Sequence, residues 1–281
     1  MSRILVVDDD DTTRLVICRL LAKAGFSVSD AKDGIEALEI LRRRTYELML
    51  LDVWMPRMSG LDLLAELRAS ELAPRVVVMT SDDAPETLLK AVREQAFKYV
   101  HKPVEPTTLV ETVREALEAP EPPRIEVLSA RADWIELMVP CSREAVGRIE
   151  GVMSQIETNL PSEMRESIAY AFRELLMNAV EWGGGLDPSR KVRISCLRAR
   201  RMILYRIADP GQGFKIEELP HAAIGQPPDD PIAHMRVREA KGLRPGGFGL
   251  LSVRSSVDEL LYNEQRNEVV FVKYLDDDTG R

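Results

Sequence analysis

The stretch ILVVDD, at Ile4–Asp9, is a short apolar run that ends in carboxylates, and it decides the fold of the first half of the chain. Later apolar runs also end at polar residues, and they cover residues 48–51, 76–79 and 99–100. Such runs have the length of buried strands, whereas the segments between them, such as 12–23 and 34–43, show helical periodicity. Strands that alternate with helices predict an α/β fold, a doubly wound parallel sheet whose site lies at the carboxyl ends of the strands.

Polar residues stand at the ends of these runs, and they are Asp8, Asp9, Asp52, Thr80 and Lys102. Carboxylates gathered in one place repel one another and form a hard oxygen site that suits Mg²⁺. In such a site Asp52 can act as a nucleophile and hold a phosphoryl group as an acyl phosphate. Lys102 would then offset the phosphoryl charge, and Thr80 would donate a hydrogen bond to a phosphoryl oxygen.

Each of these signals has a plainer interpretation when it is taken alone. The acidic run Asp8–Asp11 is typical of a solvated turn, and Asp11-Thr12-Thr13 is expected to cap the first helix. The order of the five residues, each at the end of an expected strand, nevertheless favours a phosphoacceptor site.

Residues 1–119 resemble the receiver domain of response regulators at every position that carries its chemistry. The resemblance implies a metal-binding phosphoacceptor site that consists of the acidic pair Asp8 and Asp9, the phosphoacceptor Asp52 and the backbone carbonyl of Trp54. It also implies a switch that consists of Thr80, Lys102 and Tyr99, an aromatic residue that swings inward on activation. The family's strand order 2-1-3-4-5 and its frequent cis bond at Lys102-Pro103 are expected on the same ground.

The length of the chain, 281 residues, favours two domains. The proline-rich segment 120–124 is expected to be a short, stiff linker between a receiver domain at 1–119 and a second domain at 125–281. A composition of 45% hydrophobic and 30% charged residues is typical of globular domains.

Several function classes are disfavoured by composition. The chain enters a strand at once and contains no apolar stretch of membrane-spanning length, so we expect a cytoplasmic protein without a signal peptide. A net charge of −8 and the lack of a convincing helix-turn-helix argue against nucleic-acid binding. The cysteines, Cys18, Cys141 and Cys196, lack metal-site spacing and are expected to be reduced thiols.

In the second half of the chain, strands and helices follow one another in a different order from the regular alternation of the first half. Strands are expected at 125–128, 134–139, 192–197, 203–207, 260–262 and 268–274. Helices are expected at 143–157, 163–182 and 250–257, and a long loop rich in proline and glycine at 215–247. This order predicts an α+β sandwich, one mixed or antiparallel sheet covered by helices.

Chemistry concentrates at three places in this half. Glu174 and Asn178 are four residues apart and therefore share one face of a helix. Asp209 follows a strand and precedes Gly211 and Gly213, where a ligand can approach the backbone closely. A last cluster opens a helix whose N-terminal amides suit a phosphate, and it contains Gly246, Gly247 and Gly249.

These stretches resemble the N, G1 and G2 boxes of the GHKL ATPase superfamily, and the tail of the chain most resembles its anti-sigma-factor serine kinase branch. The resemblance implies that Asn178 binds Mg²⁺, Glu174 is the general base or polarises it, and Asp209 accepts a hydrogen bond from the adenine amino group of ATP. The glycines would shape the lid and the phosphate loop. The chain departs from that branch at Trp182, where a His is often found, and in the length of its lid, which includes residues 225–228.

Two hypotheses follow. In the first, a partner histidine kinase phosphorylates Asp52, and this controls a serine/threonine protein kinase of the anti-sigma-factor type that acts on an anti-anti-sigma-like protein. In the second, the ATP-binding half is a non-catalytic module, an anti-sigma factor or adaptor that binds a partner such as a sigma factor. A sensor histidine kinase is rejected because no helical hairpin with a phosphoacceptor histidine fits between residues 123 and 143. Both halves resemble domains that often dimerise, so a homodimer fits either hypothesis.

Overall fold

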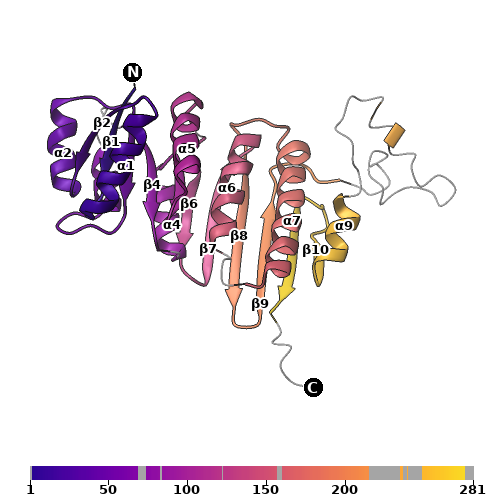
Figure 1. Cartoon of the computed structure of the whole chain (residues 1–281). Helices are drawn as coiled ribbons and strands as arrows, with labels where there is room; N and C mark the ends of the chain where they lie inside the picture. The colour runs from indigo at the N-terminus through magenta and orange to yellow at the C-terminus, as the bar shows by residue number, and fades with distance from the viewer. Residues whose placement is uncertain are drawn as a thin grey trace. The chain divides into compact units, whose positions relative to one another are not determined.

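The structure is a computed structural model, and it describes residues 2–68, 74–82, 84–121, 123–156, 160–214, 235–236, 239 and 249–275. The chain divides into two compact units, Met1–Pro122 and Pro123–Arg281, which have different folds (Figure 1).

The first unit contains a parallel sheet of five strands in the order β2-β1-β3-β4-β5, which confirms the expected 2-1-3-4-5 order. Its strands are β1 (Arg3–Val7), β2 (Ser27–Ala31), β3 (Leu48–Asp52), β4 (Arg75–Thr80) and β5 (Lys98–His101). The apolar runs predicted the other four strands but not β2, where only Ala31 is buried. An edge strand with little burial on either face needs no continuous apolar run.

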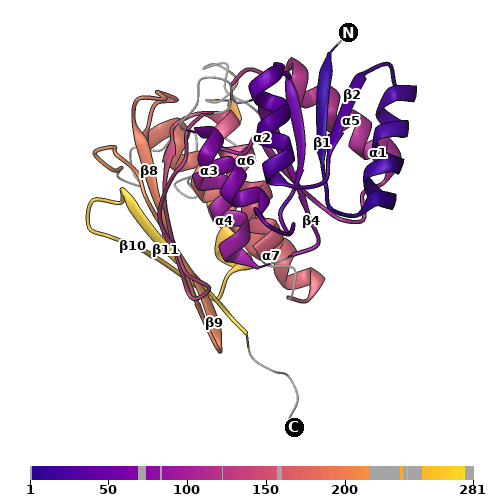
Figure 2. The same cartoon turned by 90° about the vertical axis from the view of Figure 1, so that its left-hand side faces the viewer.

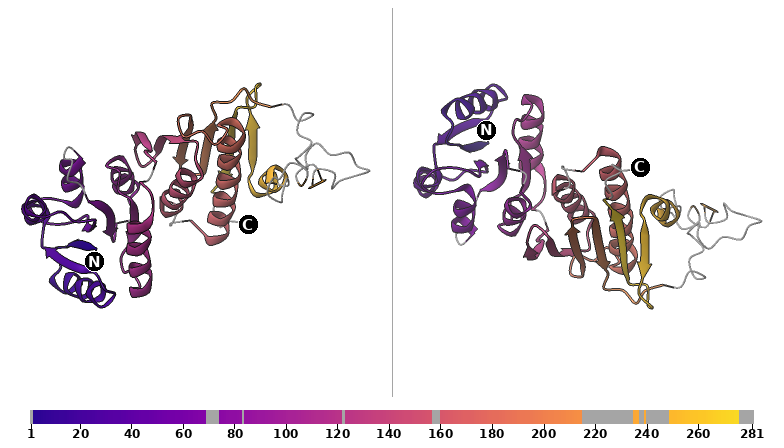
Figure 3. Two further views of the ribbon diagram at one scale, coloured as in Figure 1. Left: turned by 90° about the horizontal axis from the view of Figure 1, so that it is seen from above. Right: turned by 90° about the horizontal axis from the view of Figure 1, so that it is seen from below.

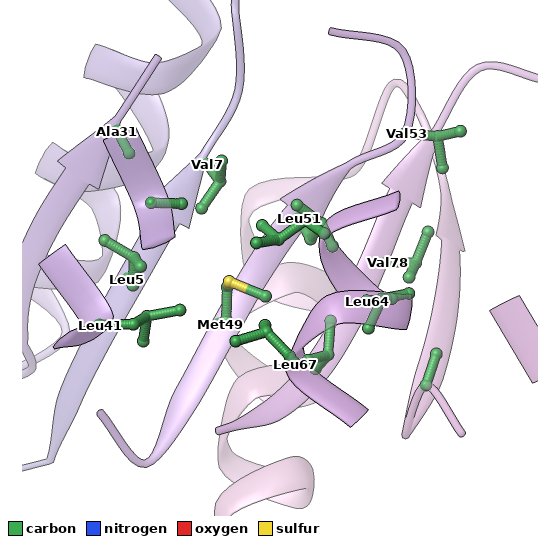
Figure 4. Packing of buried hydrophobic residues seen from close by; sticks show 14 of the residues in the cluster. Leu5, Val7, Ala31, Leu41, Met49, Leu51, Val53, Leu64, Leu67 and Val78 are labelled. Carbon is green, nitrogen blue, oxygen red and sulfur yellow. The ribbon is translucent and has the colours of Figure 1, made fainter. Parts of the chain in front are cut away.

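Helices cover both faces of this sheet, as Figure 3 shows for the first unit from two directions. They are α1 (Asp11–Lys23), α2 (Gly34–Arg43), α3 (Gly60–Arg68), α4 (Pro85–Arg93) and α5 (Pro106–Glu118). Alternate strand residues point to opposite faces, so Met49 and Leu51 pack under α2, α3 and α4, and Leu48 and Leu50 pack under α1 and α5. Figure 4 shows Met49 between Leu41 of α2 and Leu67 of α3.

The cap of α1 differs from the expectation. Asp10, not Asp11, is the N-cap residue, because its Oδ1 accepts a hydrogen bond of 2.6 Å from the backbone N–H of Thr13. Asp11 is the first residue of the helix, and its carboxylate pairs with Arg14 one turn later. The acidic run Asp8–Asp11 thus extends one residue into the helix, because its last member is already helical. With four consecutive acids, the sequence alone did not show which of them is the cap.

The second unit contains an antiparallel sheet of six strands in the order β10-β11-β9-β8-β7-β6, which confirms the α+β prediction. Its strands are β6 (Glu126–Ala130), β7 (Trp134–Pro140), β8 (Lys191–Ala199), β9 (Met202–Ala208), β10 (Glu259–Tyr262) and β11 (Glu268–Tyr274). Its helices are α6 (Arg143–Ile156), α7 (Ser162–Asn178), the π-helical turn η1 (Ala179–Gly183) and α9 (Gly249–Ser256). Figure 2 shows α6 and α7 on one side of this sheet.

An aromatic stack joins α7 to the sheet. The ring of Phe172 lies 5.1 Å from that of Tyr205 on β9, which in turn stacks at 5.0 Å on Phe271 of β11. All three side chains are buried. Because α7 carries Glu174 and Asn178, this stack fixes the helix that presents them.

The cysteines are free thiols, Cys141 and Cys196 buried and Cys18 partly so. Within the described ranges, no helix is both long and apolar enough to span a bilayer.

Candidate functional site

The predicted residues of the first unit meet at one edge of its sheet. Asp8 directly follows β1, Asp52 ends β3, Thr80 ends β4 and Lys102 directly follows β5. The strands are parallel, so their carboxyl ends lie side by side. The side chains of Asp8, Asp52 and Thr80 are all buried.

Lys102 joins the two buried carboxylates. Its Nζ donates to Asp8 Oδ2 at 2.7 Å and to Asp52 Oδ1 at 2.5 Å. The peptide bond between Lys102 and Pro103 is cis, as the resemblance implies. The sequence separations of 94 and 50 residues show that only the fold brings these groups together.

The charges of this cluster perturb one another. Burial raises the pKa of Asp52, and repulsion from Asp8 and Asp9 adds to this, although the hydrogen bond from Lys102 opposes it. Burial alone would lower the pKa of Lys102, but hydrogen bonds to Asp52 and Asp8 outweigh that effect and raise it. The site therefore favours a cation beside Asp52.

A divalent metal ion fits the donor chemistry of this edge, but not as a cage of side chains. Among the described residues, no three His, Cys, Asp or Glu side chains form a group that could hold a metal ion. Asp9 is exposed, whereas Asp8 and Asp52 are buried. Two buried carboxylates, a backbone carbonyl and water are the kind of incomplete oxygen set with which Mg²⁺ is usually bound.

Asp82, which the sequence interpretation missed, connects the predicted switch residues. Its backbone N–H donates to Thr80 Oγ1 at 3.1 Å, and its carbonyl accepts from the Tyr99 hydroxyl at 3.3 Å. Its carboxylate Oδ2 accepts from Trp54 Nε1 at 3.2 Å and from Thr87 Oγ1 at 2.7 Å. Burial opposes ionisation, but the hydrogen bonds to the carboxylate from Thr87, the backbone N–H of Ala84 and Trp54 keep the pKa of Asp82 below its ordinary value.

In the second unit, Glu174 and Asn178 lie one turn apart on α7, and both are half-buried. Helix α9 lies beside α7 (Figure 1). A Cβ atom added to Gly249, the first residue of α9, would collide with Glu174 Oε2. Gly249 therefore allows the N-terminus of α9 to approach the Glu174 carboxylate.

Asp209, which follows β9, lies against the end of η1. A Cβ atom on Gly183 or on Gly211 would collide with the Asp209 side chain. Asp209 Oδ1 accepts a hydrogen bond of 2.7 Å from the backbone N–H of Gly211. Burial raises the pKa of Asp209, although that hydrogen bond and Arg190 oppose the effect. Gly213 has a φ of 81°, which suits glycine.

Two of the predicted phosphate-loop residues, Gly246 and Gly247, lie outside the described residues, and so does most of the expected loop at 215–247. The π-helical turn η1 was not expected, because residues 163–182 were interpreted as one regular helix. The sequence interpretation also missed Asn267, whose contacts with the Asp209 loop are described below.

Two family models match the chain. The response regulator receiver domain matches residues 4–114, and the histidine kinase-like ATPase domain matches residues 139–273. Neither family model distinguishes an anti-sigma-factor kinase from other proteins with these domains.

Relatives of known type match mainly through the first unit. The transcriptional regulatory protein ZraR of Escherichia coli is 38% identical over 114 residues, which is 41% of this chain and 26% of ZraR. The chain thus spans about a quarter of that relative. The DNA-binding response regulator MtrA of Mycobacterium tuberculosis is 31% identical over 183 residues, which cover 65% of this chain and 78% of MtrA.

A solved receiver domain from Methanospirillum hungatei, described as CheY-like, is 28% identical, covers 42% of this chain and 94% of its own, and has a TM-score of 0.41. The extent of the MtrA match shows the family, and the two family models show which domains the chain combines. The chain belongs to the response regulators, with a receiver domain followed by a histidine kinase-like ATPase domain.

Proposed function

We propose that a partner histidine kinase phosphorylates Asp52, and that this controls an ATP-binding output domain which phosphorylates a serine or threonine of a protein partner. The observation that carries the first step is the pair of bonds from Lys102 to Asp8 and Asp52. They hold a buried nucleophile next to a cation that can offset phosphoryl charge. The domains would be 1–119 and 125–281, joined by the linker 120–124.

In the proposed reaction a carboxylate oxygen of Asp52 attacks phosphorus, a P–O bond forms, and the bond from phosphorus to the donor nitrogen breaks. The leaving imidazole keeps the electron pair of that bond. Asp8, Asp9, Asp52 and the carbonyl of Trp54 would hold Mg²⁺, which supplies positive charge to the transferring phosphoryl group. Lys102 can retain its bond to Asp8 while it turns toward the new phosphate.

Thr80 and Asp82 supply a route from the phosphorylated site to the rest of the domain. The Thr80 hydroxyl accepts from the Asp82 N–H and can donate its own proton to a phosphoryl oxygen. A shift of Thr80 would then move Asp82, which is bonded to Tyr99 of β5 and to Thr87 of α4. The phosphate charge would thereby change the α4 and β5 region.

In the output domain, Asn178 would hold Mg²⁺, Glu174 would act as general base or orient one, and Asp209 would accept from the adenine amino group. The approach of Gly249 to Glu174 and of Gly183 to Asp209 supports this arrangement. The N-terminus of α9, next to Glu174, suits a phosphate because its amides are unpaired within the helix.

The receiver assignment is tested by treating the full chain with a small phosphodonor and Mg²⁺ and measuring its mass. We expect the mass of one phosphoryl group to be added, and Asp52→Ala to abolish the addition. Asp133→Ala, which removes an exposed carboxylate of the second unit, is the control and should still be modified. A mass shift that persists in Asp52→Ala would contradict the assignment.

The output is tested with ATP, Mg²⁺ and a purified anti-anti-sigma-like protein. Phosphoryl transfer to that protein, lost in Glu174→Gln but not in a variant of the exposed Glu264, would support the kinase. ATP binding and partner binding without transfer would instead identify the non-catalytic module. Asn178→Ala should remove the Mg²⁺ dependence of ATP binding, and unchanged dependence would refute the role of Asn178.

A further inference from the structure

The turn between β10 and β11, at residues 263–267, lies against the loop that carries Asp209. The carbonyl of Asn267 accepts a hydrogen bond of 2.8 Å from the backbone N–H of Asp209. The side-chain Nδ2 of Asn267 donates to the carbonyl of Gly211 at 3.1 Å. Asn267 therefore bonds to the loop on both sides of Pro210.

The side chain of Asn267 is itself held in place by Asn263. Asn263 Nδ2 donates to Asn267 Oδ1 at 2.8 Å, and the backbone N–H of Asn267 donates to Asn263 Oδ1 at 3.1 Å. Because Oδ1 of Asn267 is the acceptor for Asn263, its Nδ2 is directed to Gly211. The reciprocal amide pair fixes the orientation of a donor that could otherwise rotate.

A second contact places the far end of the loop. The backbone N–H of Phe214 donates to the carbonyl of Gln265 at 3.2 Å, and a Cβ atom on Gly213 would collide with that same carbonyl. The ring of Phe214 also packs edge-on at 5.8 Å against Tyr262 of β10. The turn thus supports the loop along its whole described length.

These bonds lead directly to the Asp209 carboxylate. Gly211 receives the Asn267 amide at its carbonyl and donates its own N–H to Asp209 Oδ1 at 2.7 Å. Asn263, Asn267, Gly211 and Asp209 form one hydrogen-bonded series. A series of this kind restricts the direction in which the last acceptor points.

We propose that Asn267 is a positioning residue that aims the Asp209 carboxylate at the 6-amino group of a purine and thereby selects adenine over 6-oxo bases. The proposal rests on the proposed nucleotide-binding function of Asp209. A carboxylate accepts a hydrogen bond from an amino group, but it repels the carbonyl oxygen of a 6-oxo purine. That discrimination depends on the angle of the carboxylate, and Asn267 sets this angle through Gly211.

The test compares the affinities of ATP and inosine triphosphate, which carries oxygen at position 6, for the full chain with Mg²⁺. Asn267→Asp preserves the size of the side chain but replaces the donor to the Gly211 carbonyl with a second acceptor. We expect the affinity for ATP to fall about tenfold, since a partly buried hydrogen bond is lost and a repulsion appears, while the affinity for inosine triphosphate changes little. The ratio between the two affinities should fall by the same factor.

Two further variants separate positioning from general damage to the fold. Asn263→Ala removes the partner that orients the Asn267 amide, so it should lower the ratio in the same direction but by less. Glu264→Gln changes an exposed side chain in the same turn and should leave the ratio at its wild-type value.

The outcomes distinguish this proposal from the one on which it rests. A wild-type chain that binds neither nucleotide would overturn the nucleotide-binding function itself, and the role of Asn267 with it. A wild-type chain that prefers ATP, together with an Asn267→Asp variant that keeps the full preference, would overturn only the role of Asn267. An equal loss of affinity for both nucleotides in Asn267→Asp would also overturn it, because that is the result of a structural defect without effect on base selection.

Discussion

Lys102 and Asp52 form an ion pair of 2.5 Å, and the same ammonium lies 2.7 Å from Asp8. One cation therefore balances two buried carboxylates that come from different strands. A side chain in this position does two things at once, since it stabilises the resting fold and is already beside the atom that is to be phosphorylated.

Replacement of Lys102 by Met should lower the free energy of unfolding by about 3 kcal/mol, because it leaves two buried carboxylates without their cation. The loss should be smaller in acid, where Asp52, whose pKa is already raised, becomes neutral. Urea unfolding of the variant at neutral and acidic pH measures both effects. Lys98→Met is the matched control: its bond to Glu115 also spans 2.5 Å but is largely exposed, so its loss should cost under about 1 kcal/mol.

Gly60→Ala should destabilise the first unit and slow modification of Asp52. A Cβ atom at Gly60 would collide with the backbone carbonyl of Asp52, so either α3 or the end of β3 must move. We expect a loss of about 2 kcal/mol in thermal or urea unfolding, typical of overpacking. Gly151→Ala is the control, because its Cβ atom would meet open space in α6 and should stabilise the chain by about 0.5–1 kcal/mol. Equal effects of the two variants would contradict this account.

Asp10→Ala should lower the free energy of unfolding, through loss of the bond to the Thr13 N–H at the start of α1. Asp11→Ala should cost less, about 0.5 kcal/mol, because it removes only a pair with Arg14 within the first turn of the helix. Denaturant unfolding of the two variants decides which residue is the cap. A larger loss for Asp11→Ala would restore the original expectation.

Glu268→Gln should make stability less dependent on pH in the acidic range. The hydrogen bond from Arg206 holds the pKa of Glu268 below its ordinary value of 4.5, despite partial burial. The carboxylate therefore contributes stability that is fully present above that value and is lost as the pH falls through the lowered pKa. Both partners are partly exposed, so the difference at neutral pH should be no more than about 1 kcal/mol. Urea unfolding of wild type and variant from neutral pH to about pH 3 should show the two converging, and a gap that widens in acid would contradict this sign.

The sequence was sufficient for β1, β3 and β4 because both faces of these inner strands are covered and must therefore be apolar almost throughout. It was insufficient for β2, an edge strand whose SVSDA sequence carries almost no apolar signal. The helix at 34–43 was predicted to the residue, since Asp33 supplies a cap whose Oδ1 binds the N–H groups of Ile35 and Glu36.

For the candidate sites, the sequence predicted the charged residues but not the residues whose hydrogen bonds hold the site loops in position. Asp8, Asp52 and Lys102 could be selected because each follows an apolar run. Asp82 and Asn267 could not, because their importance comes from hydrogen bonds to residues far away in the sequence, such as Trp54 and Gly211, that only the folded chain brings within reach. Polar residues in turns are common, and no spacing rule separates these two from the others.

The π-helical turn η1 has a consequence for how the second unit tolerates the insertion or deletion of a residue. A π-helical turn closes its hydrogen bond over one more residue than an α-helical turn, so it differs from a regular turn by a single residue. At the end of this turn Gly183 lies against Asp209, and Gly184, the next residue, lies against Cys141. Deletion of one residue from 179–183 would change the register of the chain after α7, and with it the close approach of Gly183 to Asp209 and of Gly184 to Cys141.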